Sequence, residues 1–373
     1  MKKLLYTAST FSHIRNFHLP YLEYFQQQGW TVHVACGGEE EVIPHADRTI
    51  QLSLQKRMLS FDNFRAAAAL RTLIRTEGYG LISTHTALAS FFTRLALMGM
   101  RERPQVVCTV HGYLFDEHTP RLRSCILRTA EKWMAPQTDL LLTMNDWDYR
   151  VAQQYHMGHR VASVPGMGVD IARLHCEPQD GIQLRKELGL AQDAFVILYP
   201  AEFSVRKSQQ ILIQAMAHLP DHTVLVLPGC GATWEECKEL SARLGLESRI
   251  LFPGQVSPMG RWYAMADVAA SSSRIEGLPF HIMEAILCGL PVVASQVKGH
   301  VDLVKPGVTG LLYPYGDVQG CAKALLTLIQ SAELRQQLSH QEQQMECYCL
   351  EQVLPKQMEQ YERLLVHKQT LVS

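Results

Sequence analysis

This sequence of 373 residues has no marked excess of either charge, no long apolar run and no dinucleotide-binding fingerprint. Its formal net charge is -1 and its pI is near 7.0, so no overall field attracts nucleic acid, which is not expected as a partner. No stretch approaches the roughly 18 apolar residues that span a bilayer. The apolar start of the chain ends after about five residues, short of a signal peptide. These absences predict a cytoplasmic protein.

Cysteine pairs and metal-binding pairs are also scarce. The ten cysteines are scattered with no C-x-x-C spacing, which is typical of reduced, buried thiols. Asp146 and Asp148 form the only Asp-x-Asp spacing, at a predicted helix start away from the motifs described below. We therefore expect neither a metal nor a cofactor. The lack of G-x-G-x-x-G after the first strand disfavours an NAD-dependent oxidoreductase, the rival that a Rossmann pattern alone would suggest.

What the sequence does contain is a regular alternation of short apolar runs with longer segments of helical period. The chain is too long for one core, because single cores stop growing at roughly 250 to 300 residues. In the first half the runs predict parallel strands joined by helices. The strands are expected at residues 4–8, 31–36, 81–84, 106–111, 140–145 and 161–165, and the helices at 17–28, 62–76, 87–98, 120–134 and 146–155.

The same alternation starts again after a turn-rich stretch at 165–170, with strands expected at 195–200, 223–228, 249–253, 267–272 and 291–295. The predicted fold class is α/β, with two Rossmann-like doubly wound domains facing a central cleft. We expect an N-terminal domain at 1–170, a C-terminal domain at 171–350 and a final helix at 351–373, which could return to the first domain. Ligands of such sheets lie beyond the carboxyl ends of the strands, so the motifs should follow strands.

Two glutamates eight residues apart form the most informative motif. Glu276 should lie in the loop after a predicted strand and Glu284 in the next helix, since Pro279 favours a helix start. Gly277 and Leu278 form the turn between them. Both carboxylates can then point into one cleft, where they would accept charge-assisted hydrogen bonds from sugar or ribose hydroxyls.

Arg206 and Lys207 stand just before a predicted helix at 209–218. Adjacent cations at a helix N-terminus oppose the helix dipole unless an anion is bound there. A diphosphate would supply that anion.

The residues around the two glutamates resemble those of retaining glycosyltransferase family 4, which has the GT-B fold. The likeness runs from 267–290 through 306–314 and extends over nearly the whole chain. It implies that Glu284 holds the ribose hydroxyls of a nucleotide sugar and that Glu276 holds the hydroxyls of the donor sugar. Gly277 and Leu278 would line the same donor site.

The cationic loop resembles the family's G-R-x5-K element, whose lysine holds the donor diphosphate. Lys207 falls on that lysine, whereas Ala201 and Glu202 replace the Gly-Arg pair, so one expected cation is missing. We expect Arg206 to replace it. Lys207, Arg206 and backbone amides near Gly277 would then stabilise the leaving diphosphate without a metal.

Three residues of the first half complete the predicted site. The resemblance places His111 at a strand end where the family contacts the donor sugar. The loop at 9–16 takes the place of the family's glycine-rich loop but contains no glycine, so Ser12 and His13 are expected to contribute side chains instead. No residue stands out as a covalent nucleophile. The family's front-face route, in which the leaving diphosphate helps to deprotonate the acceptor, needs none.

These residues predict a retaining enzyme that moves a hexose or N-acetylhexosamine from a nucleotide sugar, expected to be a UDP-sugar, to a glycan acceptor. The resemblance is closest to bacterial transferases that extend lipid-linked sugars for capsule, exopolysaccharide or glycoprotein assembly, so a polyprenyl-diphosphate-linked acceptor is one option. A nucleotide-sugar 2-epimerase of the same architecture and a non-catalytic partner subunit are alternatives that the sequence leaves open.

A basic amphipathic segment at 120–134 suggests where a lipid-linked acceptor is met. Its apolar positions share one helical face and are flanked by cations, a pattern suited to an anionic membrane surface. The face consists of Leu122, Ile126, Thr129 and Trp133, and the cations are Arg121, Arg123, Arg128 and Lys132. The alternative is a helix packed on the core with a basic solvent face. With the first interpretation, we expect the protein to bind peripherally to the inner face of the cytoplasmic membrane.

Overall fold

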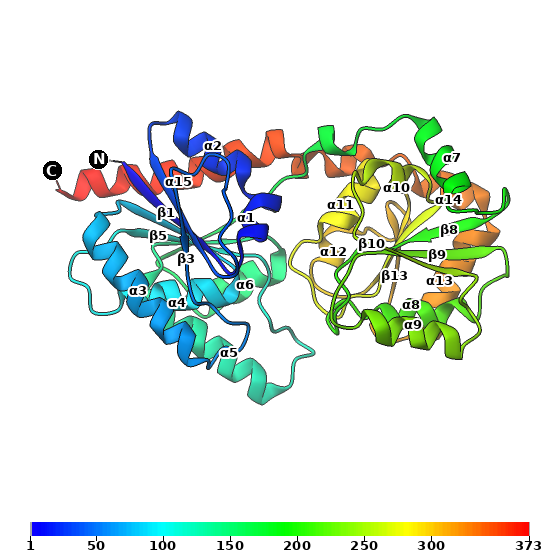
Figure 1. Cartoon of the computed structure of the whole chain (residues 1–373), viewed down its shortest axis with the longest axis horizontal. Helices are drawn as coiled ribbons and strands as arrows, with labels where there is room; N and C mark the ends of the chain where they lie inside the picture. The colour runs from blue at the N-terminus through cyan, green and yellow to red at the C-terminus, as the bar shows by residue number, and fades with distance from the viewer. Residues whose placement is uncertain (1, 373) are drawn as a thin grey trace. The chain divides into compact units, whose positions relative to one another are not determined.

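The structure, a computed structural model, describes residues 2–372, with side chains through residue 366, and divides into two units. Unit 1 contains the chain up to Met167 together with the part from Val353 onward, and unit 2 runs from Gly168 to Gln352. Residue 1 of the predicted first domain and residue 373 of the predicted final helix lie outside the described residues. Each unit contains one parallel sheet (Figure 1). The predicted fold class, with two doubly wound Rossmann-like domains, is confirmed.

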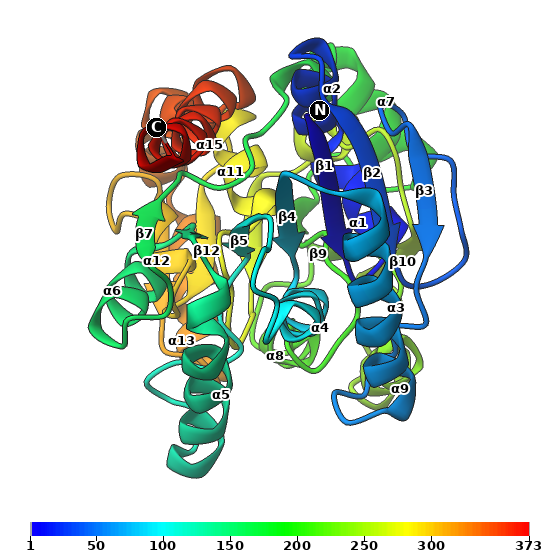
Figure 2. The same cartoon turned by 90° about the vertical axis from the view of Figure 1, so that its left-hand side faces the viewer.

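The sheet of unit 1 has seven parallel strands in the order β3-β2-β1-β4-β5-β6-β7, most of which are visible side by side in Figure 2. Its inner strands are buried along nearly their whole length, as expected when helices cover both faces. The bounds are β1 Lys3–Ala8, β2 Thr31–Cys36, β3 Arg48–Gln51, β4 Leu81–His85, β5 Gln105–Val110, β6 Leu140–Thr143 and β7 Arg160–Ser163. The strand order reverses at β1, so the switch point lies between β1 and β4.

Helices of unit 1 pack on this sheet, and α4 contacts both α3 and α5 on one of its faces. The bounds are α1 Phe11–Phe17, α2 Leu19–Gln27, α3 Phe61–Glu77, α4 Ala87–Leu97, α5 Arg121–Met134, the 3-10 helix Ala135–Gln137, α6 Asp146–Gln154 and α15 Leu350–Val372. Hydrogen bonds tie α15 to the unit 1 sheet, between the hydroxyls of Tyr361 and Ser83 (2.7 Å) and from Gln105 Nε2 to the Leu364 carbonyl (3.1 Å). Among the described residues, no helix combines the length and apolarity needed to cross a membrane.

The sheet of unit 2 has six parallel strands in the order β10-β9-β8-β11-β12-β13, with its switch point between β8 and β11. The strands are β8 Phe195–Leu198, β9 Thr223–Pro228, β10 Ile250–Gly254, β11 Val268–Ser271, β12 Val292–Ser295 and β13 Gly310–Tyr313. The helices are α7 Pro178–Glu187, α8 Gln209–Met216, α9 Trp234–Arg243, α10 Gly260–Ala264, α11 Phe280–Leu287, α12 His300–Leu303, α13 Val318–Gln330 and α14 Ala332–Leu338, with 3-10 segments Ile171–Leu174 and Glu342–Tyr348. A continuous apolar core joins the strands to α8 and α13.

All the predicted strands are present within two residues at either end, but the edge strands β3 and β13 were not predicted. β3 and β13 are short edge strands and give a weak periodic signal. The prediction of a loop at 9–16 is wrong, because residues from Phe11 onward form helix α1. The Thr10 hydroxyl caps this helix by accepting a hydrogen bond from the His13 amide (3.3 Å), and Phe11 and Ile14 bury its apolar side.

Candidate functional site

Side chains predicted to carry chemistry collect at the switch point of each sheet. In unit 2, Lys207 follows β8 and Glu276 follows β11, and these two strands are neighbours. In unit 1, His13 follows β1 and His111 follows β5, with β4 between these strands and ending at His85. The carboxyl ends of strands at a switch point are where open parallel sheets bind ligands.

Buried Glu276 and Lys207 form an ion cluster with the half-exposed Arg206 in unit 2. The Lys207 ammonium donates to Glu276 Oε1 at 2.6 Å, and Arg206 Nη1 donates to Glu276 Oε2 at 2.8 Å. The side chain of Glu276 is only 5% exposed. Burial alone would raise the pKa of Glu276, but the cations of Lys207 and Arg206 outweigh burial and hold it well below its usual value. Each oxygen of the ionised carboxylate is therefore paired with one cation.

Hydrogen bonds fix the loop that presents Lys207. The Lys207 carbonyl accepts from the Tyr199 hydroxyl at 3.0 Å, and the Ser208 carbonyl accepts from the Ser272 hydroxyl at 2.9 Å. Ser208 has a left-handed backbone (φ 51°) and comes directly before α8. Burial lowers the pKa of Lys207, and the nearby Glu276 carboxylate opposes that shift. Lys207 thus depends on Glu276 for its charge in the buried site.

The turn after Glu276 is packed against the start of α12. Gly277 and Leu278 are both buried. A Cβ at Gly299, whose φ is 80°, would lie 2.5 Å from the Gly277 carbonyl oxygen. Glycine at position 299 therefore allows the two segments to approach, and any side chain there would displace the turn that carries Glu276.

Glu284 has a different environment from Glu276. It is on α11, and its carboxylate accepts a hydrogen bond from the Tyr263 hydroxyl at 2.7 Å. Burial raises the pKa of Glu284, which the hydrogen bond from Tyr263 partly opposes. The sequence analysis did not select Tyr263, because a tyrosine inside an apolar segment has no distinctive spacing.

His13 and His111 lie together in unit 1, with two histidines that the sequence analysis did not select, His18 and His85. The ring of His13 is 4.9 Å from that of His111 and 5.0 Å from that of His18, measured between centroids. Burial lowers the pKa of His13 to about 4 and the pKa of the other three to well below the usual value. All four rings are therefore uncharged near neutral pH.

Two residues that the sequence analysis singled out lie on the surface. Ser12 is exposed on α1, and its hydroxyl lies 3.1 Å from that of Thr10, so its side chain is not part of the histidine cluster. Glu202 is also exposed, and its carbonyl accepts a hydrogen bond from Gln209 Nε2 at 2.9 Å.

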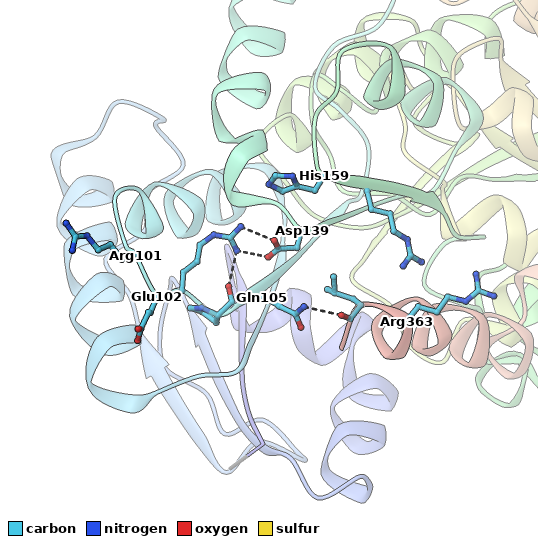
Figure 3. Close-up of a pocket in the computed structure, with 10 residues that line it drawn as sticks. Arg101, Glu102, Gln105, Asp139, His159 and Arg363 are labelled. Atoms are coloured by element: carbon cyan, nitrogen blue, oxygen red, sulfur yellow. Dashed lines mark hydrogen bonds and ion pairs between the residues drawn. The ribbon is translucent and has the colours of Figure 1, made fainter. Parts of the chain in front are cut away.

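A pocket of about 920 Å³ lies at the amino ends of the unit 1 strands, away from the histidine cluster (Figure 3). Its lining consists of Arg101, Glu102, Arg103, Pro104, Gln105, Asp139, His159, Arg160, Arg363 and Leu364. Arg103 is engaged by both oxygens of Asp139, at 2.6 and 2.9 Å. Gln105 begins β5 and Arg160 begins β7, so the pocket is at the amino ends of the strands. That position disfavours it as the main ligand site of the sheet, and no residue of the predicted site lines it.

Comparison with known proteins connects both halves of the chain with sugar transfer. The chain matches the family models Glycosyltransferase Family 4 over residues 21–173 and Glycosyl transferases group 1 over residues 181–345. A protein of Bacillus subtilis (strain 168) named as the glycosyltransferase EpsD is 31% identical over 346 residues, which cover 91% of each chain.

Two further matches cover most of the chain at lower identity. The UDP-Gal:alpha-D-GlcNAc-diphosphoundecaprenol alpha-1,3-galactosyltransferase of Escherichia coli is 23% identical over 329 residues and 84% of each chain. Among solved structures, HepE from Anabaena in complex with UDP and glucose has a TM-score of 0.80 at 22% identity, over 97% of this chain and 100% of HepE. At 22% identity, the match to HepE shows only that the two folds are alike.

Proposed function

We propose a donor, an acceptor and a reaction course for this chain, which belongs to glycosyltransferase family 4 and has the GT-B fold. It transfers a hexose or N-acetylhexosamine from a UDP-sugar to a glycan acceptor, and the anomeric configuration is retained. The cluster of Arg206, Lys207 and Glu276 carries this proposal. Two cations directly before α8 are suited to the diphosphate that a nucleotide sugar releases.

In the proposed reaction, the bond between sugar C1 and the diphosphate oxygen breaks while the acceptor oxygen bonds to C1 on the same face. The acceptor proton passes to the leaving diphosphate. Negative charge grows on the diphosphate as the bond breaks, and Lys207 and Arg206 stabilise that charge. Glu276 stays ionised because its pKa is lowered, so it can accept hydrogen bonds from donor sugar hydroxyls.

Two further roles belong to this proposal. Glu284, with the Tyr263 hydroxyl beside it, binds the ribose hydroxyls of the nucleotide. His111 contacts the donor sugar through a neutral ring, which can act as a donor at one nitrogen and an acceptor at the other.

The named substrates of the two distant relatives support the choice of donor and acceptor. The E. coli relative is named for a UDP-galactose donor and a diphosphoundecaprenol-linked acceptor, and HepE was solved with UDP and glucose. From these names we infer that this chain uses a UDP-sugar donor and a lipid-linked acceptor. It would then act in bacterial surface polysaccharide or glycan assembly.

A screen of UDP-sugars by thermal shift, followed by turnover with and without acceptor, tests the proposal. The correct donor at about 100 times its Kd should stabilise the protein by roughly 2.7 kcal/mol. Product should require the acceptor and should not require added Mg²⁺, because Lys207 and Arg206 replace a metal ion at the diphosphate. Release of free sugar from the donor alone would instead favour the 2-epimerase alternative.

Exposed apolar residues on α5 support a membrane contact in this proposal. Leu122, Ile126 and Trp133 are 76%, 60% and 56% exposed, which disfavours the alternative of a helix packed on the core. Arg121, Arg123 and Lys132 are exposed beside them. An exposed helix face with aromatic, aliphatic and basic side chains is suited to an anionic bilayer surface.

Arg128 is not part of that free basic face. Its guanidinium donates to the Tyr155 hydroxyl at 2.5 Å and stacks on the Tyr155 ring, 4.9 Å from the centroid. A charge reversal at Arg128 would therefore disturb packing inside unit 1. The membrane test is better made at Arg121 and Arg123.

The double variant Arg121→Glu, Arg123→Glu should lose sedimentation with vesicles that contain anionic lipid, since each basic residue near such a surface contributes about 1 kcal/mol. The control variant Lys238→Glu, Arg243→Glu reverses two exposed cations on α9 in unit 2 and should sediment like the wild type. Equal sedimentation of all three proteins would exclude α5 as the membrane contact.

A further inference from the structure

The histidine cluster of unit 1 contains nitrogen atoms that its own contacts leave unused. His13 Nε2 and His18 Nε2 are both buried, and neither has a hydrogen-bond partner among the described residues. One ring nitrogen from each of His13, His18 and His111 can be chosen so that all three lie within 4.8 Å of one another. Buried nitrogen atoms without partners are costly, so their convergence favours a ligand that binds their lone pairs.

Topology brings these three side chains together from separate parts of the chain. His13 is on α1 directly after β1, His18 separates α1 from α2, and His111 follows β5. The sequence gives no metal-binding spacing, because His111 is far from the other two. The parallel sheet places them at one edge, near its switch point.

A second layer of hydrogen bonds orients two of the rings. The Tyr6 hydroxyl is 3.0 Å from His18 Nδ1, which leaves Nε2 as the outward nitrogen of His18. His85 Nδ1 is 3.2 Å from His111 Nε2, and His85 Nε2 is 2.8 Å from the Ser83 hydroxyl. Both nitrogens of His85 are thus engaged, so His85 supports the cluster instead of joining the ligand set. Histidine ligands of metals commonly have such a partner on the other ring nitrogen.

We propose that His13, His18 and His111 form a binding site for a divalent transition-metal ion of the zinc class. Three neutral imidazoles are a ligand set for zinc, cobalt, nickel or copper, whereas magnesium and calcium prefer carboxylate oxygens. Zinc bound to nitrogen at 2.0 to 2.1 Å in a tetrahedron needs ligand nitrogens roughly 3.4 Å apart.

This site is distinct from the charge cluster of Lys207, Arg206 and Glu276, which lies in unit 2. It shares His13 and His111 with the predicted contacts to the donor. The inference does not rest on the proposed function, because metal binding is measured without donor or acceptor.

Titration of the metal-free, full-length protein with Co²⁺ tests the proposal, after alkylation of the exposed Cys125, Cys230 and Cys347. One equivalent of Co²⁺ should give visible absorption of a tetrahedral nitrogen-ligated ion without a thiolate charge-transfer band, and Zn²⁺ should displace it. His13→Gln removes a ligand from a partly exposed position and should weaken Co²⁺ binding at least 100-fold. His85→Gln removes a supporting contact and should weaken it about 10- to 100-fold.

His33→Gln is the matched control, since His33 is also buried in unit 1 but pairs with the Tyr79 hydroxyl, at 2.8 Å, outside the cluster. It should bind Co²⁺ like the wild type. Circular dichroism and thermal unfolding of each metal-free variant check that it is folded. A wild-type protein without the visible band, or equal affinity in wild type and a folded His13→Gln variant, would overturn the proposal.

Discussion

The switch points of the two sheets stabilise buried polar side chains by opposite means. In unit 2, a carboxylate and two cations are in direct contact, so each charge has a partner before any ligand arrives. In unit 1, burial lowers the pKa of four histidines, and the rings are held without charge. The same topological position, the switch point of a parallel sheet, therefore supports different chemistry in the two units. In our proposals, unit 2 presents cations to an anion, and unit 1 presents lone pairs to a metal ion or a hydroxyl.

The largest effect on this comparison should come from Lys207→Ala. Loss of a preorganised cation that faces developing charge lowers kcat/KM by about 10²- to 10³-fold. Lys238→Ala, which removes an exposed lysine on α9, is the control and should keep wild-type turnover. Steady-state rates with the identified UDP-sugar measure the effect, and circular dichroism checks that the variant is folded. Wild-type kcat/KM in folded Lys207→Ala would remove the diphosphate role from this lysine.

Glu276→Gln should show that the unit 2 cluster depends on paired charge. The substitution keeps the size of the side chain but leaves the buried Lys207 without its anion. Breaking a buried ion pair costs roughly 3 to 5 kcal/mol, and we expect about 3 because Arg206 is 41% exposed and remains partly solvated. Urea unfolding measures the loss, with the exposed Glu235→Gln on α9 as the control. A loss below about 1 kcal/mol would mean that solvent already screens the cluster.

Arg206→Ala should have a smaller effect, on ligand affinity. If Arg206 replaces the cation missing at Glu202, it contributes one charge-assisted contact to the diphosphate. Such a contact is worth about 1.5 to 3 kcal/mol, and solvent exposure of Arg206 reduces that to the lower end. We expect roughly a tenfold rise in the Kd for UDP by calorimetry. The exposed Arg243→Ala serves as the control. An unchanged Kd would place the compensating cation elsewhere.

The sequence was sufficient to predict all the strands except the edge strands β3 and β13, because buried parallel strands are short apolar runs between helical segments. It was also sufficient to select Glu276, Lys207 and Arg206, since their motifs follow strands. It could not predict that Glu276 contacts both cations, because that contact joins residues about 70 positions apart through the pairing of β8 with β11. The same limit applies to Tyr263 beside Glu284.

The histidine cluster shows the limit of single-residue reasoning. His18 and His85 have no motif around them, and each alone is typical of a structural histidine. Only the order of β1, β4 and β5 brings them to His13 and His111. Helix α1 was missed although its Thr10 cap is local, because Ser, Thr, His and Asn are common in loops and the burial of Phe11 and Ile14 depends on tertiary structure.

The smallest and most specific effect should be a pH dependence confined to the unit 2 cluster. The pKa of Glu276 in the folded protein lies below its value of 4.5 in an unfolded chain. Its contribution to stability is therefore present above about pH 4.5 and is lost as the pH falls below that value, when the unfolded chain takes up a proton first. The difference in unfolding free energy between wild type and Glu276→Gln should stay constant from pH 7 to about 5.5 and shrink below about 4.5. Hydrogen exchange in unit 1 should respond to acid equally in both proteins, because the substitution lies in unit 2. A difference that persists unchanged to pH 3.5 would show that Glu276 contributes by packing and not by charge.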